Sequence, residues 1–167
     1  MAARDRFNKA LKWLEDWTPS GHIRTYIVPL GKIHGKVRLP DERYRCVFCK
    51  MLMLKISEHI AMRERADLIV TGDVLSQVAS QTPSNLRAIS SVTTLPILRP
   101  LVGMDKNEID DFARSIGLYS IVAKDVGECR LVPRYPATST PDKMLNTLKK
   151  LVEEINMEDV VDGSTIL

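Results

Sequence analysis

The three cysteines are the residues of this chain best suited to chemistry. Two residues separate Cys46 from Cys49, a spacing that brings two sulfurs within reach of one metal centre or of each other. Cys129 lies far downstream, in an irregular segment of the kind that often carries functional residues. Three thiolates suit an iron–sulfur cluster that leaves one iron open. The sequence therefore predicts a metal site formed by Cys46, Cys49 and Cys129.

Other interpretations of the cysteines remain open. Zinc would need a fourth ligand, for which His34 is the best candidate and His22 the next. The pair could also be a redox couple, although no strand directly precedes it, or two buried and inert thiols. Cys129 alone could be a partly exposed thiol without a role. The odd cysteine count excludes a complete disulfide framework, and a reducing compartment would keep the thiols available for metal.

Length and composition predict a single globular domain over residues 1–167. Hydrophobic residues make up 44% of the chain and charged residues 27%, which argues against disorder. No signal peptide is recognisable, and no apolar run approaches the ~20 residues that span a bilayer. We therefore expect a cytoplasmic protein. The net charge of +3 permits an anionic partner such as RNA but equally fits an ordinary solvated surface.

Hydrophobic periodicity predicts alternating helices and strands. Helices are expected over residues 4–17, 46–66, 84–92, 106–116 and from 140 to about 157. Strands are expected over residues 24–30, 68–70, 97–101 and 119–122. Residues 31–45 are expected to form a loop, and residues 158–167 have no clear pattern. The apolar run 68–70 is typical of a strand buried on both faces, and the methionines of the long helix, Met51, Met53 and Met62, are expected in the core.

This order of elements predicts an α/β fold with a parallel sheet and helices on both faces. In such sheets ligands bind beyond the carboxyl ends of the strands. The segment Thr71–Asp73 leaves one such end, where Gly72 would let a ligand approach the backbone. Gln81 follows and could read the edge of a base. An ordinary strand-to-helix connection explains the same residues about equally well.

Several strings in the chain are similar to those of one enzyme family. They are CVFCK at 46–50, IVTGDVLSQVASQT at 69–82, PILRPLVGMDK at 96–106, EC at 128–129 and VPRYP at 132–136. Together they resemble the catalytic domain of the tRNA 4-thiouridine synthetases, also called thiamine-biosynthesis sulfurtransferases. The resemblance runs from about residue 4 to residue 160, and the string around Gln81 is its most specific part.

The resemblance implies an adenine-nucleotide α-hydrolase fold and an activity. Family members use ATP to adenylate a uridine in tRNA, and sulfur then displaces AMP. Nucleotide contacts of the family fall on the positions of Lys50, Gly72 and Gln81, although many members have arginine where Lys50 stands. The third cysteine, Cys129, matches the family's sulfur-handling cysteine. Where a Cys-x-x-Cys is also present, the three thiols resemble an iron–sulfur ligand set, which here is Cys46, Cys49 and Cys129.

One family motif is missing from the 167 residues. The pyrophosphate loop, or PP-loop, reads Ser-Gly-Gly-x-Asp-Ser on the first strand of the family, and only Ser20-Gly21 is faintly similar to it. The first strand–helix–strand unit is missing with it, so the ATP site would be incomplete and a sheet edge uncovered. Either a partner chain carries the loop, or ATP chemistry has been lost.

The favoured hypothesis is the sulfur-transfer half of a tRNA thiolation enzyme. Its expected partners are tRNA, a sulfur donor, and either a PP-loop-bearing chain or a second copy; no membrane is expected. One alternative is a non-catalytic module that holds zinc or an iron–sulfur cluster. Another is a metal-free carrier with a persulfide on Cys129.

Overall fold

A computed structural model describes residues 2–123, 127 and 129–167, and the chain divides into two compact units. Unit 1 comprises Met1–Tyr26, Met104–Cys129 and Ile166–Leu167. Unit 2 comprises Ile27–Gly103 and Arg130–Thr165. No helix in the described part of the chain is both long and apolar enough to cross a membrane.

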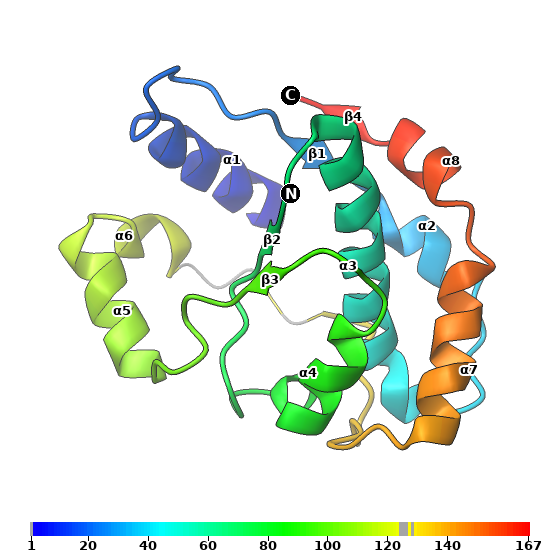
Figure 1. The fold of residues 1–167 in the computed structure, drawn as a ribbon. Helices are drawn as coiled ribbons and strands as arrows, with labels where there is room; N and C mark the ends of the chain where they lie inside the picture. Colours follow the sequence, from blue (N-terminus) through cyan, green and yellow to red (C-terminus); the bar gives the residue numbers. More distant parts are fainter. Residues whose placement is uncertain (1, 124–126, 128) are drawn as a thin grey trace. The chain divides into compact units, whose positions relative to one another are not determined.

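The described residues of unit 1 form three helices: α1 (Ala2–Glu15), α5 (Lys106–Ser115) and α6 (Tyr119–Val122) (Figure 1). A reciprocal capping box starts α5, as the sequence predicts: Asp105 accepts a hydrogen bond from the Glu108 amide, and Glu108 accepts one from the Asp105 amide. Gly117 follows α5 with a φ of +76°, a backbone conformation that favours glycine.

The strand expected over residues 119–122 is wrong, because these residues form α6. Their backbone bonds are local, from Ile121 to Leu118 and from Ala123 to Tyr119. The Tyr119 ring lies 4.1 Å below the Arg114 guanidinium of α5. Strand propensity depends on a neighbouring strand, and this segment packs beside a helix instead.

Unit 2 is built on one long helix, α3 (Arg45–Glu64), which confirms the helix predicted over residues 46–66. Phe48, Met51 and Leu52 of α3 are fully buried, and α4, α7 and α8 pack against the helix (Figure 1). The bounds of these helices are Pro83–Ser90 for α4, Asp142–Glu153 for α7 and Met157–Asp162 for α8. A short helix, α2 (Leu30–His34), and two 3₁₀ turns, η1 (Glu42–Tyr44) and η2 (Ala79–Gln81), complete the unit's helical parts.

Three expectations for unit 2 need correction. Residues 31–45 are not a plain loop, because α2 and η1 lie within them. The last predicted helix, α7, ends at Glu153, and a further helix, α8, follows in the tail that has no clear sequence pattern, with Asn156 capping it through the Glu158 and Asp159 amides. Of the three methionines expected in the core, only Met51 is buried; Met53 and Met62 are 47% and 58% exposed.

Two parallel strands carry the site described below. Strand β2 (Ile69–Val70) pairs with β3 (Ile97–Leu98) in the register Ile69↔Ile97 and Val70↔Leu98. Ile69 is buried, whereas Val70 is 60% and Leu98 50% exposed. One face of this sheet is therefore bare, and the prediction that residues 68–70 are buried on both faces is wrong.

The remaining strands form a separate sheet. Strand β1 (Tyr26–Ile27), predicted over residues 24–30, pairs with β4 (Thr165–Ile166). Thr25 and Leu167 beside them exchange both backbone hydrogen bonds. The expected parallel pairing is therefore confirmed for β2 and β3, while β1 lies in a different two-stranded sheet.

A buried carboxylate fixes the connection that leads into β3. Glu58 of α3 is 1% exposed and accepts hydrogen bonds from the Thr94 amide (2.7 Å), Thr93 Oγ1 (2.8 Å) and Lys55 Nζ (2.6 Å). Burial alone would raise the pKa of Glu58, but these bonds outweigh it and lower the pKa to about 2. Glu58 is therefore ionised and holds the residues just before β3 against α3.

Candidate functional site

A cavity of about 410 Å³ lies along strand β2 of unit 2. Its walls come from α3, β2 with the residues that follow it, η2 and α4. The lining residues are Lys50, Met53, Leu54, Ser57, Ile69, Val70, Thr71, Gly72, Asp73, Gln81 and Ile89. The cavity therefore includes the carboxyl end of a parallel strand, where α/β proteins bind their ligands.

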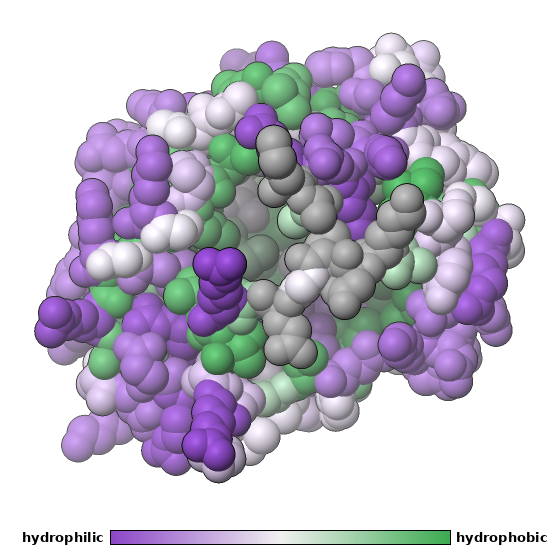
Figure 2. Space-filling model, turned by 180° about the vertical axis from the view of Figure 1, so that it is seen from behind, coloured by the Kyte–Doolittle hydropathy of each residue, from purple (hydrophilic) through white to green (hydrophobic). Residues whose placement is uncertain are grey.

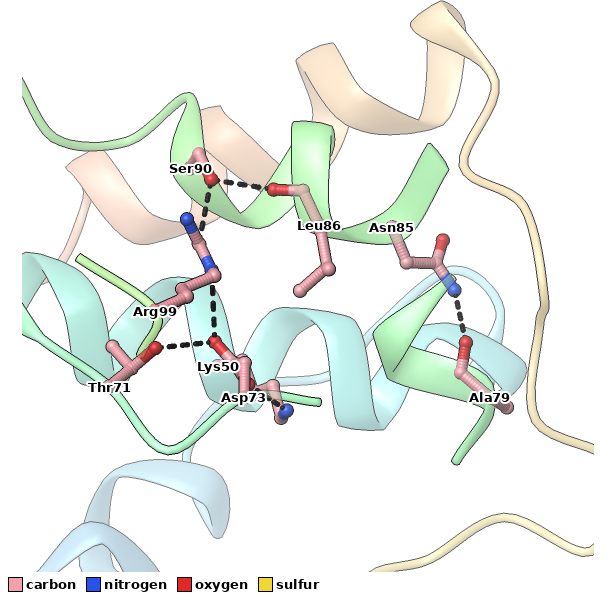
Figure 3. A network of polar contacts seen from close by, with 8 residues as sticks. All are labelled: Lys50, Thr71, Asp73, Ala79, Asn85, Leu86, Ser90 and Arg99. Carbon is pink, nitrogen blue, oxygen red and sulfur yellow. Dashed lines mark hydrogen bonds and ion pairs between the residues drawn. The ribbon is translucent and has the colours of Figure 1, made fainter. Parts of the chain in front are cut away.

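Asp73 is the centre of a network of polar contacts at this end of the cavity (Figure 3). Its Oδ1 lies 2.6 Å from Lys50 Nζ, and its Oδ2 accepts hydrogen bonds from Thr71 Oγ1 at 2.8 Å and Arg99 Nε at 3.3 Å. Arg99 in turn donates to Ser90 Oγ at 2.8 Å. The network thus joins α3, the loop after β2, the end of β3 and α4.

The charges of this network favour an ionised Asp73. Burial by itself would raise the pKa of this carboxyl group, but the hydrogen bonds from Lys50 and Thr71 and the positive charges of Lys50 and Arg99 lower it below its usual range. One carboxylate is thus shared between two cations. Positive charge therefore exceeds negative charge at this end of the cavity, which suits an anionic ligand.

Gln81 lines the cavity but also shapes its wall. In the amide orientation that satisfies both groups, Gln81 Nε2 donates to Val74 O at 3.1 Å and Oε1 accepts from Val74 N at 3.3 Å. The Gln81 carbonyl accepts a further hydrogen bond from Ser76 N at 3.1 Å. Gln81 thus closes the loop after β2 onto η2, with its amide engaged on backbone.

Asn85 supports the same wall from behind. It is fully buried in α4, and its Nδ2 donates to Ala79 O at 2.7 Å (Figure 3) and to Ala137 O at 2.9 Å. Its Oδ1 accepts from Thr140 Oγ1 at 2.6 Å. One amide therefore connects η2 to the chain that leads into α7.

The backbone at the end of β2 leaves room for a ligand. A Cβ placed on Gly72 would meet no atom within 4 Å, so the backbone there borders open space that a ligand can approach. Lys50 supplies a cation and Asp73 holds it in place. The structure therefore places Lys50, Gly72 and Gln81 around one cavity; what they bind there stays a prediction.

Cys46 and Cys49 lie near the start of α3, and Cys49 directly precedes Lys50. Both are half-buried, and their three-residue separation puts them on the same side of the helix. Cys129 is exposed and belongs to unit 1.

The thiol pair supplies only part of a metal site. Among the described residues, no three histidine, cysteine, aspartate or glutamate side chains form a group that could hold a metal ion. The three-cysteine ligand set therefore stays a prediction.

His34, the first candidate for a zinc ligand, lies buried at the end of α2. Its ring packs edge-on against Phe48 of α3, with 5.9 Å between the ring centroids. Neither ring nitrogen has a hydrogen-bond partner within the described part of the chain. Burial, and secondarily the charge of Arg45, lower the pKa of His34 and favour its neutral form. His22, the second candidate, is exposed and lies in unit 1.

Parallel strands with a polar cavity at their carboxyl ends define an α/β ligand-binding protein. The model of the family described as "Thiamine biosynthesis protein (ThiI)" matches residues 1–157. The chain therefore belongs to the ThiI family.

Named relatives agree with this assignment. A "Probable tRNA sulfurtransferase" of Methanocaldococcus jannaschii is 46% identical over 115 residues, which are 69% of this chain and 30% of that protein. A protein of the same description from Methanosarcina acetivorans is 34% identical over 99% of this chain and 41% of its own length. This chain thus spans well under half the length of both relatives.

A solved structure is similar to the whole chain. It is described as a "4-thiouridine synthetase - RNA complex with bound ATP", and it matches with a TM-score of 0.87 at 32% identity. The match covers 100% of this chain and 45% of the solved one. The mixed α/β fold expected from the sequence is thereby confirmed at this coarse level.

Sequence reasoning missed some residues that build the site. Asp73 and Arg99 stand inside the family strings, but no local pattern indicates that they share an ion network. Asn85 gave no signal, because a buried asparagine in a helix looks like any polar helical residue until its partners are known.

Proposed function

We propose that this chain is the sulfur-transfer half of an ATP-dependent tRNA thiolation enzyme that makes 4-thiouridine. A partner chain with the PP-loop would complete it. The observation that carries the proposal is the cavity at the end of β2. Lys50 lines this cavity and lies on α3, the helix that also holds Cys46 and Cys49 near its start. Family membership supports it, as does the solved relative that contains RNA and ATP.

In this proposal the polar end of the cavity holds part of ATP. Lys50 would face its phosphates, Gly72 would let the nucleotide approach the backbone, and Gln81 would keep the wall closed around it. The fold would be the adenine-nucleotide α-hydrolase type without its first strand–helix–strand unit, and residues 1–167 would act as one partial domain. The enzyme would act in the cytoplasm, where tRNA and a sulfur donor meet it.

The cysteines would handle sulfur. Once a uridine oxygen has been adenylated with loss of pyrophosphate, sulfide from the donor, held at the cysteine site, would attack the ring carbon, and AMP would leave with that oxygen. Cys129 is the proposed catalytic cysteine, and Cys46, Cys49 and Cys129 are the proposed ligands of an iron–sulfur cluster. This requires the two units to bring Cys129 to the pair, and Cys129 is exposed, so its thiol is accessible.

Reconstituted thiolation tests the function. The chain would be co-purified without oxygen with the part of the Methanocaldococcus jannaschii relative that lies outside the matched region, then given ATP, sulfide and unmodified tRNA. Thiolated tRNA is retarded on a mercury-containing gel. We expect product with the natural chain, none with Cys129→Ser, and at least tenfold less with Lys50→Ala. Lys150→Ala, an exposed lysine of α7, is the matched control.

Metal analysis of the same preparation separates the alternatives. Iron with acid-labile sulfide, lost in Cys46→Ser and Cys49→Ser, supports the cluster. Colourless protein with bound zinc and no thiolation would favour a non-catalytic module. With polysulfide and a thiol reductant in place of sulfide, thiolation that persists in Cys46→Ser without any metal would favour a persulfide carrier, because polysulfide supplies sulfur already at the oxidation level of a persulfide.

A further inference from the structure

Tyr135 is the most exposed large hydrophobic residue in the described part of the chain, at 69%. Leu131 and Val132 of the same segment are 45% and 54% exposed. On the face drawn in Figure 2, hydrophobic residues reach the surface in patches between hydrophilic ones. An aromatic ring that folding leaves in water, close in sequence to further apolar side chains, indicates a binding contact.

Arg134 occupies one face of the Tyr135 ring. Its guanidinium carbon Cζ lies 5.3 Å from the ring centroid, within the range of a cation–π contact. Because Tyr135 is so exposed, the opposite face of its ring is open to solvent. This pair, which we call the stacking platform, offers a flat aromatic surface with a positive charge behind it.

Two prolines stiffen the stacking platform. Pro133 and Pro136 stand directly before Arg134 and directly after Tyr135. A proline ring fixes its own φ at about −65° and also restricts the backbone of the residue before it. The backbone around Tyr135 therefore has little freedom to lose, which lowers the entropic cost of binding a ligand there.

Hydrogen bonds fix the chain just after the stacking platform. Ala137 O accepts a bond from Asn85 Nδ2 at 2.9 Å, and Thr138 O accepts one from Thr82 Oγ1 at 2.7 Å. Tyr135 stands two residues before Ala137, so their Cα atoms are at most about 7 Å apart. The ring is therefore presented from a segment that is fastened to the start of α4.

The same asparagine connects this segment to the cavity wall. Asn85 Nδ2 also donates to Ala79 O of η2 (Figure 3), and Gln81 of η2 lines the cavity. One side chain thus holds the segment of Tyr135 and the η2 wall together. A ligand on the stacking platform would therefore lie close to the wall of the proposed nucleotide site.

The charges of the segment favour an anionic ligand. Residues 130–141 include two arginines, Arg130 and Arg134, and no acidic residue. Both arginines are exposed. A guanidinium can stack with its flat face and still donate hydrogen bonds to phosphate from its edge. Aromatic rings and guanidinium planes are the groups on which proteins stack unpaired RNA bases.

We propose that the open face of Tyr135 stacks on an unpaired uridine of the RNA substrate, and that Arg134 binds a phosphate beside it. The inference rests on the proposed function, because a uridine oxygen can meet ATP only after its base has left the RNA stack. Enzymes that act on a base turn it out of the stack and hold it against aromatic side chains. The stacking platform would hold the uridine in this way.

Binding of a short, fluorescently labelled single strand of uridines to the full chain tests the platform, with no ATP and no sulfur donor present. Tyr135→Ala should weaken binding at least fivefold, since each base stacked on an aromatic ring contributes strongly to affinity. Tyr135→Phe should bind within about twofold of the natural chain, because phenylalanine keeps the stacking face. Trp17→Ala is the matched control, an aromatic residue of unit 1 that is 64% exposed.

Salt dependence separates the two parts of the platform. Arg134→Ala should reduce the slope of log K against log salt by about 0.7, the value of one phosphate contact on a single strand. Tyr135→Ala should weaken binding without changing this slope, because stacking releases no counterion. Lys150→Ala, an exposed lysine of α7, is the control for charge.

Crosslinking locates the base. A uridine strand that contains one 4-thiouridine forms covalent bonds with nearby side chains under near-ultraviolet light. We expect mass spectrometry to find the crosslink in the tryptic peptide 135–143 of the natural chain and of Tyr135→Phe. The same crosslink should fall at least fivefold in Tyr135→Ala.

Four results would overturn the proposal: no binding of the strand, equal affinity of the alanine and phenylalanine variants at Tyr135, a fully paired RNA bound as tightly as the single strand, or a crosslink confined to other peptides. Self-association of the chain that Tyr135→Ala abolishes would instead assign the ring to a protein contact. An unchanged melting curve for Tyr135→Ala shows that this variant is folded.

The platform and the proposed function can fail separately. A chain that binds and crosslinks as expected but never supports thiolation would refute the function and leave the platform intact. Thiolation by Tyr135→Ala at the natural rate and KM would refute the platform and leave the function intact.

Discussion

Lys50 Nζ lies 2.6 Å from Asp73 Oδ1, an ion pair that joins α3 to the loop after β2 across 23 positions of sequence. Arg99 contacts the other oxygen of the same carboxylate at 3.3 Å. The pairing is unequal, because Asp73 serves two cations whereas Lys50 has this one carboxylate. Removing the carboxylate and removing the lysine should therefore have different consequences.

We expect Asp73→Ala to lower the free energy of unfolding by about 3 kcal/mol, because it leaves two poorly solvated cations facing each other. Lys50→Ala should lower it by only about 1 kcal/mol, since Arg99 and Thr71 still satisfy the carboxylate. Urea unfolding measures both values, with Lys150→Ala as an exposed control. Equal losses for the two variants would contradict this account.

Glu58 predicts how stability changes in acid. Its pKa falls from the usual 4.5 to about 2 in the folded chain, so the unfolded chain binds its proton first as the pH decreases. The stabilisation is complete above pH 4.5 and is lost as the pH falls towards 2. Glu58→Gln should reduce stability at neutral pH and flatten this acid slope. Unfolding by urea at several pH values tests it, and the exposed Glu154→Gln should leave the slope as it is.

Asn85 should tolerate no replacement that loses its two donor hydrogens. In Asn85→Asp, a buried carboxylate would face the carbonyls of Ala79 and Ala137, and we expect a loss of about 3 kcal/mol in the free energy of unfolding. Asn146→Asp, on the exposed side of α7, should change it by less than about 0.5 kcal/mol. Similar losses in both variants would show that the hydrogen bonds from Asn85 to Ala79 and Ala137 contribute little to stability.

The capping box of α5 gives a local prediction for unit 1. Asp105→Ala should free the Glu108 amide, which donates to Asp105 Oδ1 at 2.9 Å, and destabilise the start of the helix by about 1 kcal/mol. Hydrogen exchange at the Glu108 amide should then be about fivefold faster. Asp105→Ser should preserve most of the protection, because serine also caps helices. No difference between alanine and serine would argue against a capping role.

The elements that the sequence predicted well have strong local signals. Helices α3 and α5 have long periodic patterns or explicit caps, and the parallel strands β2 and β3 are apolar runs between helices. The segment 119–122 was mistaken for a strand because β-branched residues favour strands only when a neighbour is present. The exposure of Val70 was also unexpected, because an apolar run alone does not reveal whether a partner covers it.

The sequence predicted some of the residues of the candidate site, but not the contacts between them. Lys50, Gly72 and Gln81 came from the family resemblance, and the structure places them around one cavity. The contact between Asp73 and Arg99 and the hydrogen bonds from Asn85 to residues 137 and 140 join positions far apart in sequence, so no local pattern could indicate them. The convergence of Cys129 with Cys46 and Cys49 stays a prediction, because these residues lie in different units.

Helix α3 fixes the distances between the side chains that it contributes to the proposed site. In a regular helix each residue follows the last with a rise of about 1.5 Å and a rotation of about 100°. The spacing between the two thiols, the ammonium group of Lys50 and Met53 is therefore independent of any loop. Inserting a single residue after Cys49 would swing both sulfurs about a quarter of the way around the axis. Surface loops of this chain can vary in length, but the interval from 46 to 57 has to keep its residue count.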